Sequence, residues 1–330
     1  MLEHGGRLLR AIKHYGIPRE DWLDLSSGIA PWAFPIPDVP LRAWARLPET
    51  DDGLEQAAAA YYGVTRLLPV AGSQAAIQAL PRLRPRGKVG VLSPCYAEHA
   101  EAWRRAGHEL LELDETQVDA CLDQLDALVL VNPNNPTGRV LAPDTLLAWH
   151  ARLARRGGWL LVDEAFIDNT PALSIAACSE RPGLIVLRSF GKFFGLAGVR
   201  LGFVLAEAPL LRALAQELGP WSISGPTRVL GQACLADRQA QAQQTLRCAE
   251  ASARLAALLE STGLKPAGGC DLFQYLRHEQ APVLHEFMAR RGILLRLFDQ
   301  PPSLRFGLPA DEADWQRLAV ALDAYRKEQP

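Results

Sequence analysis

Five consecutive apolar residues, Ala127 to Val131, constrain the fold of this 330-residue chain more than any other stretch. An antiparallel strand with one wet face alternates apolar and polar residues, whereas a parallel strand covered by helices on both faces is apolar throughout. Trp159–Val162 and Leu184–Leu187 have the same character, and a helix is predicted between the first two runs, over Pro143–Arg155. The chain is therefore predicted to be an α/β protein with a mostly parallel sheet.

Polar clusters follow these strands. Asn132-Pro-Asn-Asn-Pro-Thr-Gly138 follows the first, where two prolines fix the loop that presents Asn135, and Asp163-Glu164 follows the second. In open α/β sheets, ligands bind at the carboxyl ends of the strands, so two such clusters indicate a shared site. A simpler explanation of Asp163 is a helix cap.

Two earlier strands show the same arrangement. Leu67–Ala71 precedes Gly72-Ser73-Gln74, which is predicted to begin a helix. The free N–H groups at the start of a helix favour binding of an anion. The alternative is that Ser73 only caps the helix, since serine is common at that position without any ligand. Val89–Leu92 precedes Tyr96, which is placed either to stack on a flat ring or to fill the core. A further strand is predicted over Val199–Leu205.

Lys192 is the most unusual residue, because it lies among aromatic and glycine residues after Leu184–Leu187. Desolvation leaves a lysine amine neutral and able to attack an aldehyde. Ser189 and Arg200 are placed to bind a phosphate. A phosphate-bearing aldehyde held by lysine is pyridoxal 5′-phosphate, PLP. The alternative is a structural lysine whose ammonium group reaches solvent.

Residues 41–220 are predicted to form this large PLP-binding domain, and residues 1–40 and 221–330 to form an N-terminal arm and a smaller α+β domain. The proline-rich arm is expected to be irregular but docked, because Trp22, Trp32 and Phe34 are costly to leave in water. Beyond it we expect one long helix from Pro226 to about Leu259, and then strands at 272–276, 293–297 and 303–306.

Composition excludes several classes of function. A net charge of −2 without blocks of like charge does not suit nucleic-acid binding, and there is neither a signal-like apolar core nor a run long enough to span a membrane. The six cysteines are scattered without metal-ligand spacing, so we expect no metal and a cytoplasmic protein with reduced thiols.

Taken together, Gly-Ser-Gln (72–74), Asn-Pro-Asn-Asn-Pro-Thr-Gly (132–138), Asp-Glu-Ala-Phe (163–166) and Ser-Phe-Gly-Lys (189–192) resemble the fold-type I PLP-dependent enzymes of the class I and II aminotransferase family. The order and spacing hold across nearly the whole chain. His4-Gly5-Gly6, Asp24-Leu-Ser-Ser-Gly28 and Tyr61-Tyr62-Gly63 further resemble the branch that decarboxylates L-threonine O-3-phosphate in cobalamin biosynthesis.

The resemblance implies a role for each site residue. Lys192 would carry PLP, Asp163 would pair with the pyridine nitrogen, and Asn135 would bind the ring oxygen. The remaining cofactor contacts would come from Gly72, Ser73, Gln74, Tyr96, Ser189 and Arg200. Arg305 would bind the substrate carboxylate, Arg296 the carboxylate or the phosphate, and Gly28 would also contact substrate.

The implied reaction is decarboxylation of L-threonine O-3-phosphate to (R)-1-amino-2-propanol O-2-phosphate by a homodimeric lyase. Two alternatives remain: an aminotransferase acting on a phosphorylated amino acid such as histidinol phosphate, and a catalytically silent binding protein with the same fold. Three residues depart from the family pattern: Phe166 replaces a tyrosine, Leu47 replaces a tyrosine that reaches the neighbouring subunit, and Ala30 replaces an asparagine.

Overall fold

The computed structural model describes residues 5–328, so His4 lies outside the described residues. The chain divides into two compact units. The larger unit comprises residues 34–135 and 140–243, and the smaller unit comprises residues 1–33, 136–139 and 244–330. The last boundary falls inside helix α11 (Arg238–Ser261).

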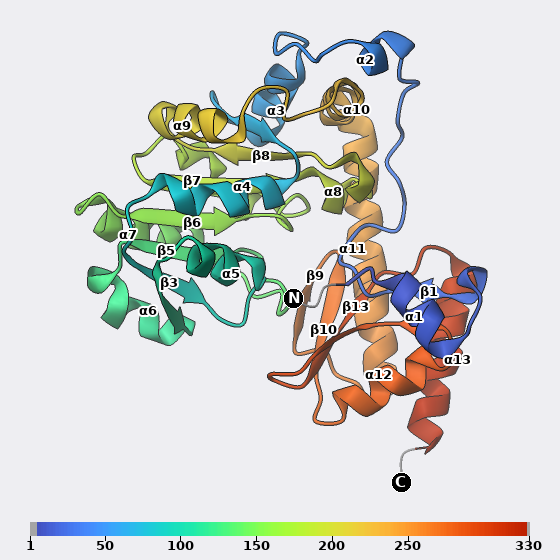
Figure 1. The fold of residues 1–330 in the computed structure, drawn as a ribbon. Coiled ribbons are helices and arrows are strands. Elements are labelled where there is room, and N and C mark those ends of the chain that lie inside the picture. The colour runs from blue at the N-terminus through green and yellow to red at the C-terminus, as the bar shows by residue number, and fades with distance from the viewer. Residues whose placement is uncertain (1–4, 329–330) are drawn as a thin grey trace. The chain divides into compact units, whose positions relative to one another are not determined.

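A seven-stranded sheet forms the centre of the larger unit (Figure 1). Its order is β2 (Leu68–Val70), β8 (Gly202–Leu205), β7 (Leu184–Ser189), β6 (Trp159–Asp163), β5 (Ala127–Val131), β3 (Lys88–Leu92) and β4 (Glu109–Leu113). Strand β8 runs antiparallel to both of its neighbours, and the pairs from β7 to β4 are parallel. The predicted mostly parallel sheet is confirmed.

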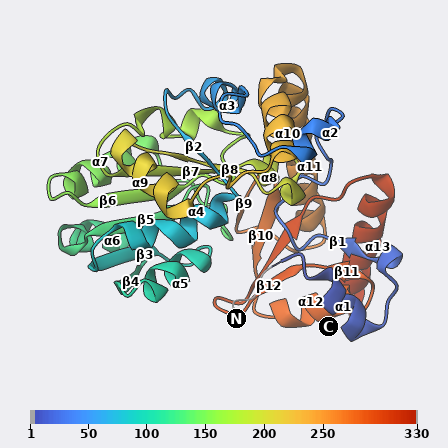
Figure 2. The same cartoon turned by 45° about the horizontal axis from the view of Figure 1, so that its top comes forward.

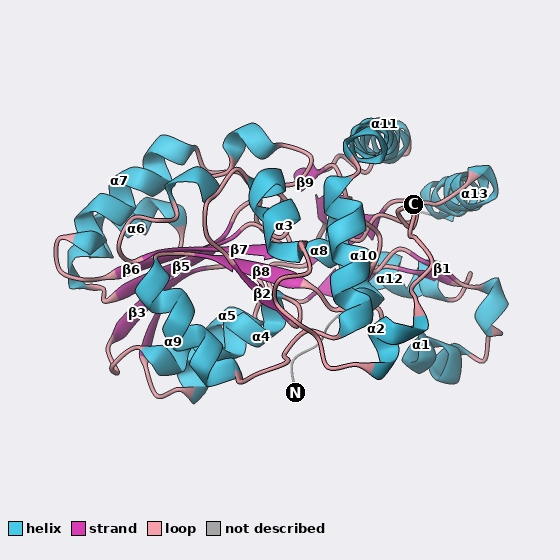
Figure 3. Cartoon of the chain, turned by 90° about the horizontal axis from the view of Figure 1, so that it is seen from above, coloured by secondary structure: helices cyan, strands magenta, loops and turns pink. Residues whose placement is uncertain are grey.

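Helices cover both faces of this sheet, as the view from above shows (Figure 3). Helices α4 (Ser73–Ala79), α5 (Glu98–Arg105) and α9 (Ala208–Leu218) lie on one face, and α3 (Leu54–Tyr62), α6 (Glu115–Cys121) and α7 (Pro143–Ala154) lie on the other. Successive strand residues enter opposite cores: Leu161 belongs to the first, whereas Leu160 and Val162 belong to the second. This double burial explains the continuous apolar runs.

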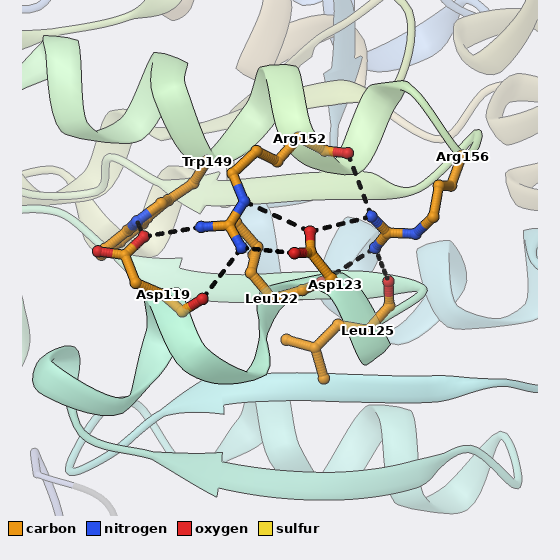
Figure 4. A network of polar contacts seen from close by, with 7 residues as sticks. All are labelled: Asp119, Leu122, Asp123, Leu125, Trp149, Arg152 and Arg156. Carbon is orange, nitrogen blue, oxygen red and sulfur yellow. Dashed lines mark hydrogen bonds and ion pairs between the residues drawn. The ribbon is translucent and has the colours of Figure 1, made fainter.

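An ion-pair network on the surface joins α7 to the end of α6 (Figure 4). Arg152 binds the carboxylates of Asp119 and Asp123, with nitrogen–oxygen distances of 3.0 and 2.8 Å. Arg156 donates to the carbonyls of Leu122 and Leu125, both at 3.0 Å, beyond the end of α6. The network therefore supplies side-chain donors to backbone carbonyls in the turn that follows α6.

A four-stranded antiparallel sheet forms the smaller unit, in the order β12 (Arg296–Phe298), β13 (Ser303–Gly307), β10 (Phe273–Arg277) and β9 (Gly268–Cys270). Helix α12 (Ala281–Ala289) packs beside it (Figure 2), and α13 (Glu312–Glu328) contacts α12. A separate parallel pair joins β1 (Leu23–Asp24) to β11 (Ile293–Leu294).

Three sequence predictions were wrong. The expected helix from 226 to 259 is two helices, α10 (Gly225–Ala236) and α11, because Asp237 leaves the helical conformation and its side chain accepts a hydrogen bond from the Ala240 amide. The strand expected at 293–297 is split between β11 and β12, which pair with different partners. The strand expected at 199–205 begins only at Gly202, because Arg200 has a left-handed backbone, with φ at 55°.

The N-terminal arm is less irregular than expected, because helix α1 (Leu8–Tyr15) forms there and buries Ala11 against Trp22 and Leu294. The proline-rich residues that follow are irregular as far as α2 (Leu41–Ala45). Of the three aromatic residues expected to dock the arm, Trp22 and Phe34 are buried, and Trp32 is half-buried and donates from its ring nitrogen to the Ala310 carbonyl at 2.7 Å. All six cysteines are free thiols, and within residues 5–328 no helix is long and apolar enough to cross a bilayer.

Candidate active site

A cavity of about 130 Å³ opens in the larger unit, where the strands of the sheet end. All nine residues predicted to contact a cofactor line it: Gly72, Ser73, Gln74, Tyr96, Asn135, Asp163, Ser189, Lys192 and Arg200. These residues come from six separate segments of the chain. They meet because parallel strands place their carboxyl ends at one edge of a sheet.

Asp163 and Ser189 reach the cavity from the ends of two neighbouring strands. Asp163 is the last residue of β6, and Ser189 is the last residue of β7. Lys192 follows on the short helix α8 (Phe190–Phe193). Gly191 permits this tight path, since a side chain there would press against the backbone of Ala197.

The Asp163 carboxylate is held on both oxygens. Its Oδ2 lies 2.9 Å from Nε2 of His99, and its Oδ1 accepts a hydrogen bond of 3.1 Å from the Ala165 amide. Asp163 and His99 are both buried. The direction of the carboxylate at the cavity is therefore fixed by two donors.

Sequence reasoning missed His99. The residue lies on α5, three positions after Tyr96, and its ring is packed edge-on to the Tyr96 ring. The sequence shows only that a histidine follows shortly after the carboxyl end of a buried strand. It does not show that Asp163 is the partner of that histidine.

Arg200, Gly72 and two serines all line the cavity. Gly72 has a positive φ of 72°, and a Cβ atom built there would approach Nη2 of Arg200 to 2.6 Å. The missing side chain therefore makes room for the guanidinium group beside the backbone. Ser73 and Ser189 add hydroxyl groups to the same lining, a donor set that suits a phosphate.

Tyr96 is anchored at its hydroxyl. That hydroxyl donates to Oε1 of Gln74 at 3.2 Å, and Gln74 donates in turn to Glu98 at 2.8 Å. Burial raises the pKa of Tyr96 to about 12, helped by the charges of Glu98 and Asp163, so the phenol stays protonated at neutral pH. Across the cavity, Nζ of Lys192 lies 5.7 Å from the centre of the Phe166 ring.

The three predicted substrate residues belong to the smaller unit. Arg305 and Arg296 face each other across the antiparallel pair β13 and β12. Arg305 is buried and donates to the carbonyl of Ser26 at 3.0 Å. Ser26 lies two residues before Gly28 in the chain. Burial, together with the charge of Arg296, lowers the pKa of Arg305 to about 10. Two facing cations of this kind suit an anionic ligand.

Arg296 also lines a second cavity, of about 580 Å³, within the smaller unit. Arg7, Arg10 and His14 reach this cavity from α1 and the residue before it. Within residues 5–328, no group of three or more His, Cys, Asp or Glu side chains is arranged to hold a metal ion.

The sheet and the lysine-containing cavity at its edge define the fold of the fold-type I PLP-dependent enzymes. The chain belongs to the aminotransferase class I and II family, whose model matches residues 41–322. It is 65% identical over 327 residues, 99% of both chains, to a threonine-phosphate decarboxylase of Pseudomonas aeruginosa. It is 46% identical to one from a Sinorhizobium species, over 97% of both chains.

Solved structures share the fold. The L-threonine-O-3-phosphate decarboxylase of Porphyromonas gingivalis superposes with a TM-score of 0.78 at 20% identity, over 92% of this chain and 99% of that one. The histidinol-phosphate aminotransferase of Sinorhizobium meliloti, solved in complex with pyridoxal 5′-phosphate, gives a TM-score of 0.75 at 20% identity, over 99% of this chain and 88% of that one.

Proposed function

We propose that this chain is a PLP-dependent carbon–carbon lyase that decarboxylates L-threonine O-3-phosphate to (R)-1-amino-2-propanol O-2-phosphate in cobalamin biosynthesis. The observation that carries the proposal is the 65% identity, over 99% of both chains, to a curated threonine-phosphate decarboxylase. The family assignment and the lining of the cavity in the larger unit support it.

The cavity lining fits PLP group by group. Arg200, Ser73, Ser189 and the Gly72 backbone would hold the phosphate, and Lys192 would hold the aldehyde carbon. Asp163 would meet the pyridine nitrogen, Asn135 the ring hydroxyl, and Tyr96 a face of the ring. Phe166 offers no hydrogen bond to that ring hydroxyl, which distinguishes this site from family aminotransferases with tyrosine there.

PLP, when bound, accepts the electron pair left on the α-carbon as a bond to that carbon breaks. Asp163 supports this by keeping a proton on the pyridine nitrogen, and His99 holds the carboxylate in place for that contact. Lys192, in its ammonium form, would be the group placed to give the α-carbon a proton. Arg305 binds the carboxylate before the bond breaks, and Arg296 adds a second cation for the carboxylate or the phosphate.

The second candidate is transamination of a phosphorylated amino acid, since the same side chains would loosen the α-carbon–hydrogen bond instead. The choice depends on which bond lies perpendicular to the cofactor ring. The missing hydroxyl at Phe166 is compatible with the lyase. A catalytically silent protein would not need the complete set of lysine, carboxylate, amide and arginine in one cavity.

One experiment separates the three functions. The purified protein, loaded with PLP, is incubated with L-threonine O-3-phosphate in the presence and absence of 2-oxoglutarate. Carbon dioxide released without a keto acid supports the lyase, and glutamate formed only with 2-oxoglutarate establishes the aminotransferase. If neither carbon dioxide nor glutamate forms, the silent binding protein is the remaining function.

We further propose that the chain acts as a homodimer in a reducing compartment such as the cytoplasm. Leu41, Trp44 and Leu47 lie on and after α2 in the larger unit with exposed fractions of 85, 66 and 64%. Apolar side chains gathered at this density favour burial against another protein surface. A second copy would supply that surface through a self-complementary contact.

A further inference from the structure

A buried ionic cluster lies on the face of the sheet opposite the cofactor cavity. Side chains alternate along a strand, so Asp163 and Ser189 point into the cavity, whereas the adjacent Glu164 and Arg188 point away from it. Arg188, Glu164 and Asp168 are each less than 10% exposed, at 3, 0 and 7%.

Arg188 is the centre of the cluster. Its Nη1 lies 3.1 Å from Oε2 of Glu164, and its Nη2 lies 2.7 Å from Oδ1 of Asp168. The same guanidinium group lies over the ring of Tyr62, 4.5 Å from its centre, and Tyr61 donates to Asp168 at 3.1 Å. Burial disfavours the charge on Arg188, but the two carboxylates outweigh it and raise its pKa.

Glu164 extends the cluster to a neighbouring turn. It accepts hydrogen bonds from the Ser174 hydroxyl and from the Ile175 amide, the latter at 2.9 Å. Its own amide donates to the Leu187 carbonyl at 2.9 Å, which continues the ladder between β6 and β7 beyond Asp163. One cluster therefore ties together the end of β6, the residues after it, the turn at Ser174, the end of β7 and helix α3.

A buried ion cluster contributes little net stability compared with apolar residues of the same size, so its presence calls for another explanation. The position of the cluster supplies that explanation. The strand ends that it ties together carry Asp163, at the end of β6, and the residues that lead from β7 to Lys192. We propose that Arg188, Glu164 and Asp168 are positioning residues of the cofactor site, which set Asp163 and Lys192 at the spacing that the PLP ring requires. This inference rests on the proposed function.

Arg188→Met, of similar length and without charge, is the informative variant, and Arg188→Lys is its conservative counterpart. The matched control is Arg152→Met, because Arg152 also binds two aspartates but lies on the surface away from the cavity. Full-length proteins are titrated with PLP well below the unfolding temperature of each variant, and the visible absorbance of the lysine-bound cofactor is followed against concentration and pH.

We expect Arg188→Met to bind PLP about tenfold more weakly or worse, the order of loss that removal of one charge-assisted contact produces, and to move the pH midpoint of the visible absorbance. Arg188→Lys should recover part of both, and Arg152→Met should change neither. A folded Arg188→Met protein with wild-type affinity and midpoint overturns the inference. If that variant does not fold, Glu164→Gln and Asp168→Asn, which keep size and shape, are measured against the same criteria.

The titration needs no substrate, so it is separate from the test of the lyase. Wild-type protein that binds PLP but does not release carbon dioxide would remove the proposed reaction and leave the positioning role testable. Wild-type protein that forms no lysine-bound cofactor would overturn both proposals.

Discussion

Nε2 of His99 lies 2.9 Å from Oδ2 of Asp163, and both side chains are buried. An ionised carboxylate only accepts hydrogen bonds, so Nε2 of His99 carries the proton in this pair. Nδ1 of His99 is buried and has no hydrogen-bond partner among residues 5–328. Asp163 therefore depends on one ring nitrogen from α5 as well as on its own loop for its orientation.

Replacing His99 by phenylalanine should lower kcat more than it raises KM. The change keeps the aromatic shape but removes a donor to a charged group, a contact worth about 1.5–3 kcal/mol, or roughly 10- to 150-fold in rate. Steady-state kinetics with L-threonine O-3-phosphate measure the effect. His108→Phe is the control, because His108 is also buried and bonds the Pro81 carbonyl at 2.9 Å, away from the cavity. Equal losses in both variants would contradict a specific role for His99.

Lys192 should be the residue that binds PLP covalently. The wild-type protein is expected to be yellow, and borohydride reduction followed by peptide mapping should place a phosphopyridoxyl group on Lys192. Lys192→Ala should lose the covalent group, and Lys88→Ala, a change at the start of β3, should keep it. A label on another lysine would remove Lys192 from the site.

Arg305 and Asp163 should differ in the kinetic constant that they control. Arg305→Ala removes a partner of the substrate carboxylate, which typically costs about 2–5 kcal/mol and should appear mainly in KM. The carboxylate charge passes into the ring as carbon dioxide leaves, so a tighter grip by Arg305 would not favour the transition state. Asp163→Ala should instead lower kcat. The assignment fails if Arg305→Ala lowers kcat alone.

Arg228 should support stability in a pH-dependent way. Its Nε and Nη2 bind Asp52 at 2.6 and 2.7 Å, and Nη2 also binds Glu55 at 2.6 Å. Burial tends to raise the pKa of Asp52, but the hydrogen bonds from Arg228 and the Leu54 amide and the charge of Arg228 together outweigh burial and lower that pKa below its usual 3.8. Stability from a depressed carboxylate is complete above the unfolded pKa and is lost as the pH falls through the folded pKa.

We therefore expect Arg228→Met to reduce the free energy of unfolding by about 1–3 kcal/mol at pH 7, and by progressively less below about pH 3.8. This loss of free energy of unfolding is smaller than for a fully buried ion pair, because the Asp52 and Glu55 side chains are 35 and 30% exposed. Thermal unfolding between pH 7 and pH 3 measures the difference. Arg152→Met, in the exposed network of Figure 4, should change the free energy of unfolding much less than Arg228→Met at every pH in that range.

Leu47→Glu should weaken the proposed homodimer, because it places a charge among Leu41 and Trp44 on the exposed apolar surface. Light scattering at several concentrations should show a wild-type dimer and a larger monomer fraction for the variant. Leu246→Glu is the control, since Leu246 is 61% exposed on α11 and lies in the other unit. A wild-type monomer at micromolar concentration would refute the dimer.

The sequence predicted the central strands because double burial leaves a run such as Ala127–Val131 without polar residues. It did not reveal β4, whose Glu-Leu-Leu-Glu-Leu lies at the edge of the sheet and is partly exposed. The break at Asp237 was missed because helical periodicity continues on both sides of it, and one side-chain cap decides the outcome.

The cofactor lining was predictable from the polar residues that follow parallel strands, which converge at one edge, together with the family resemblance. His99 and Arg188 were not, because each acquires its meaning from a partner brought close only by folding. His99 and Asp163 are 64 residues apart in the chain, and Arg188 and Asp168 are 20 apart.

The alternation of side chains in β7 bears on how this protein can change length during evolution. Ser189 and Arg188 serve opposite faces of one strand, and a one-residue insertion between Leu184 and Leu187 would exchange them. The Arg188 guanidinium group would then point toward the cavity and the Ser189 hydroxyl toward the core. The cofactor site and the ionic cluster would therefore be lost in a single event. A one-residue change of length within β7 should therefore be harder to accommodate than a change in the turn before Leu184, which does not line the cavity.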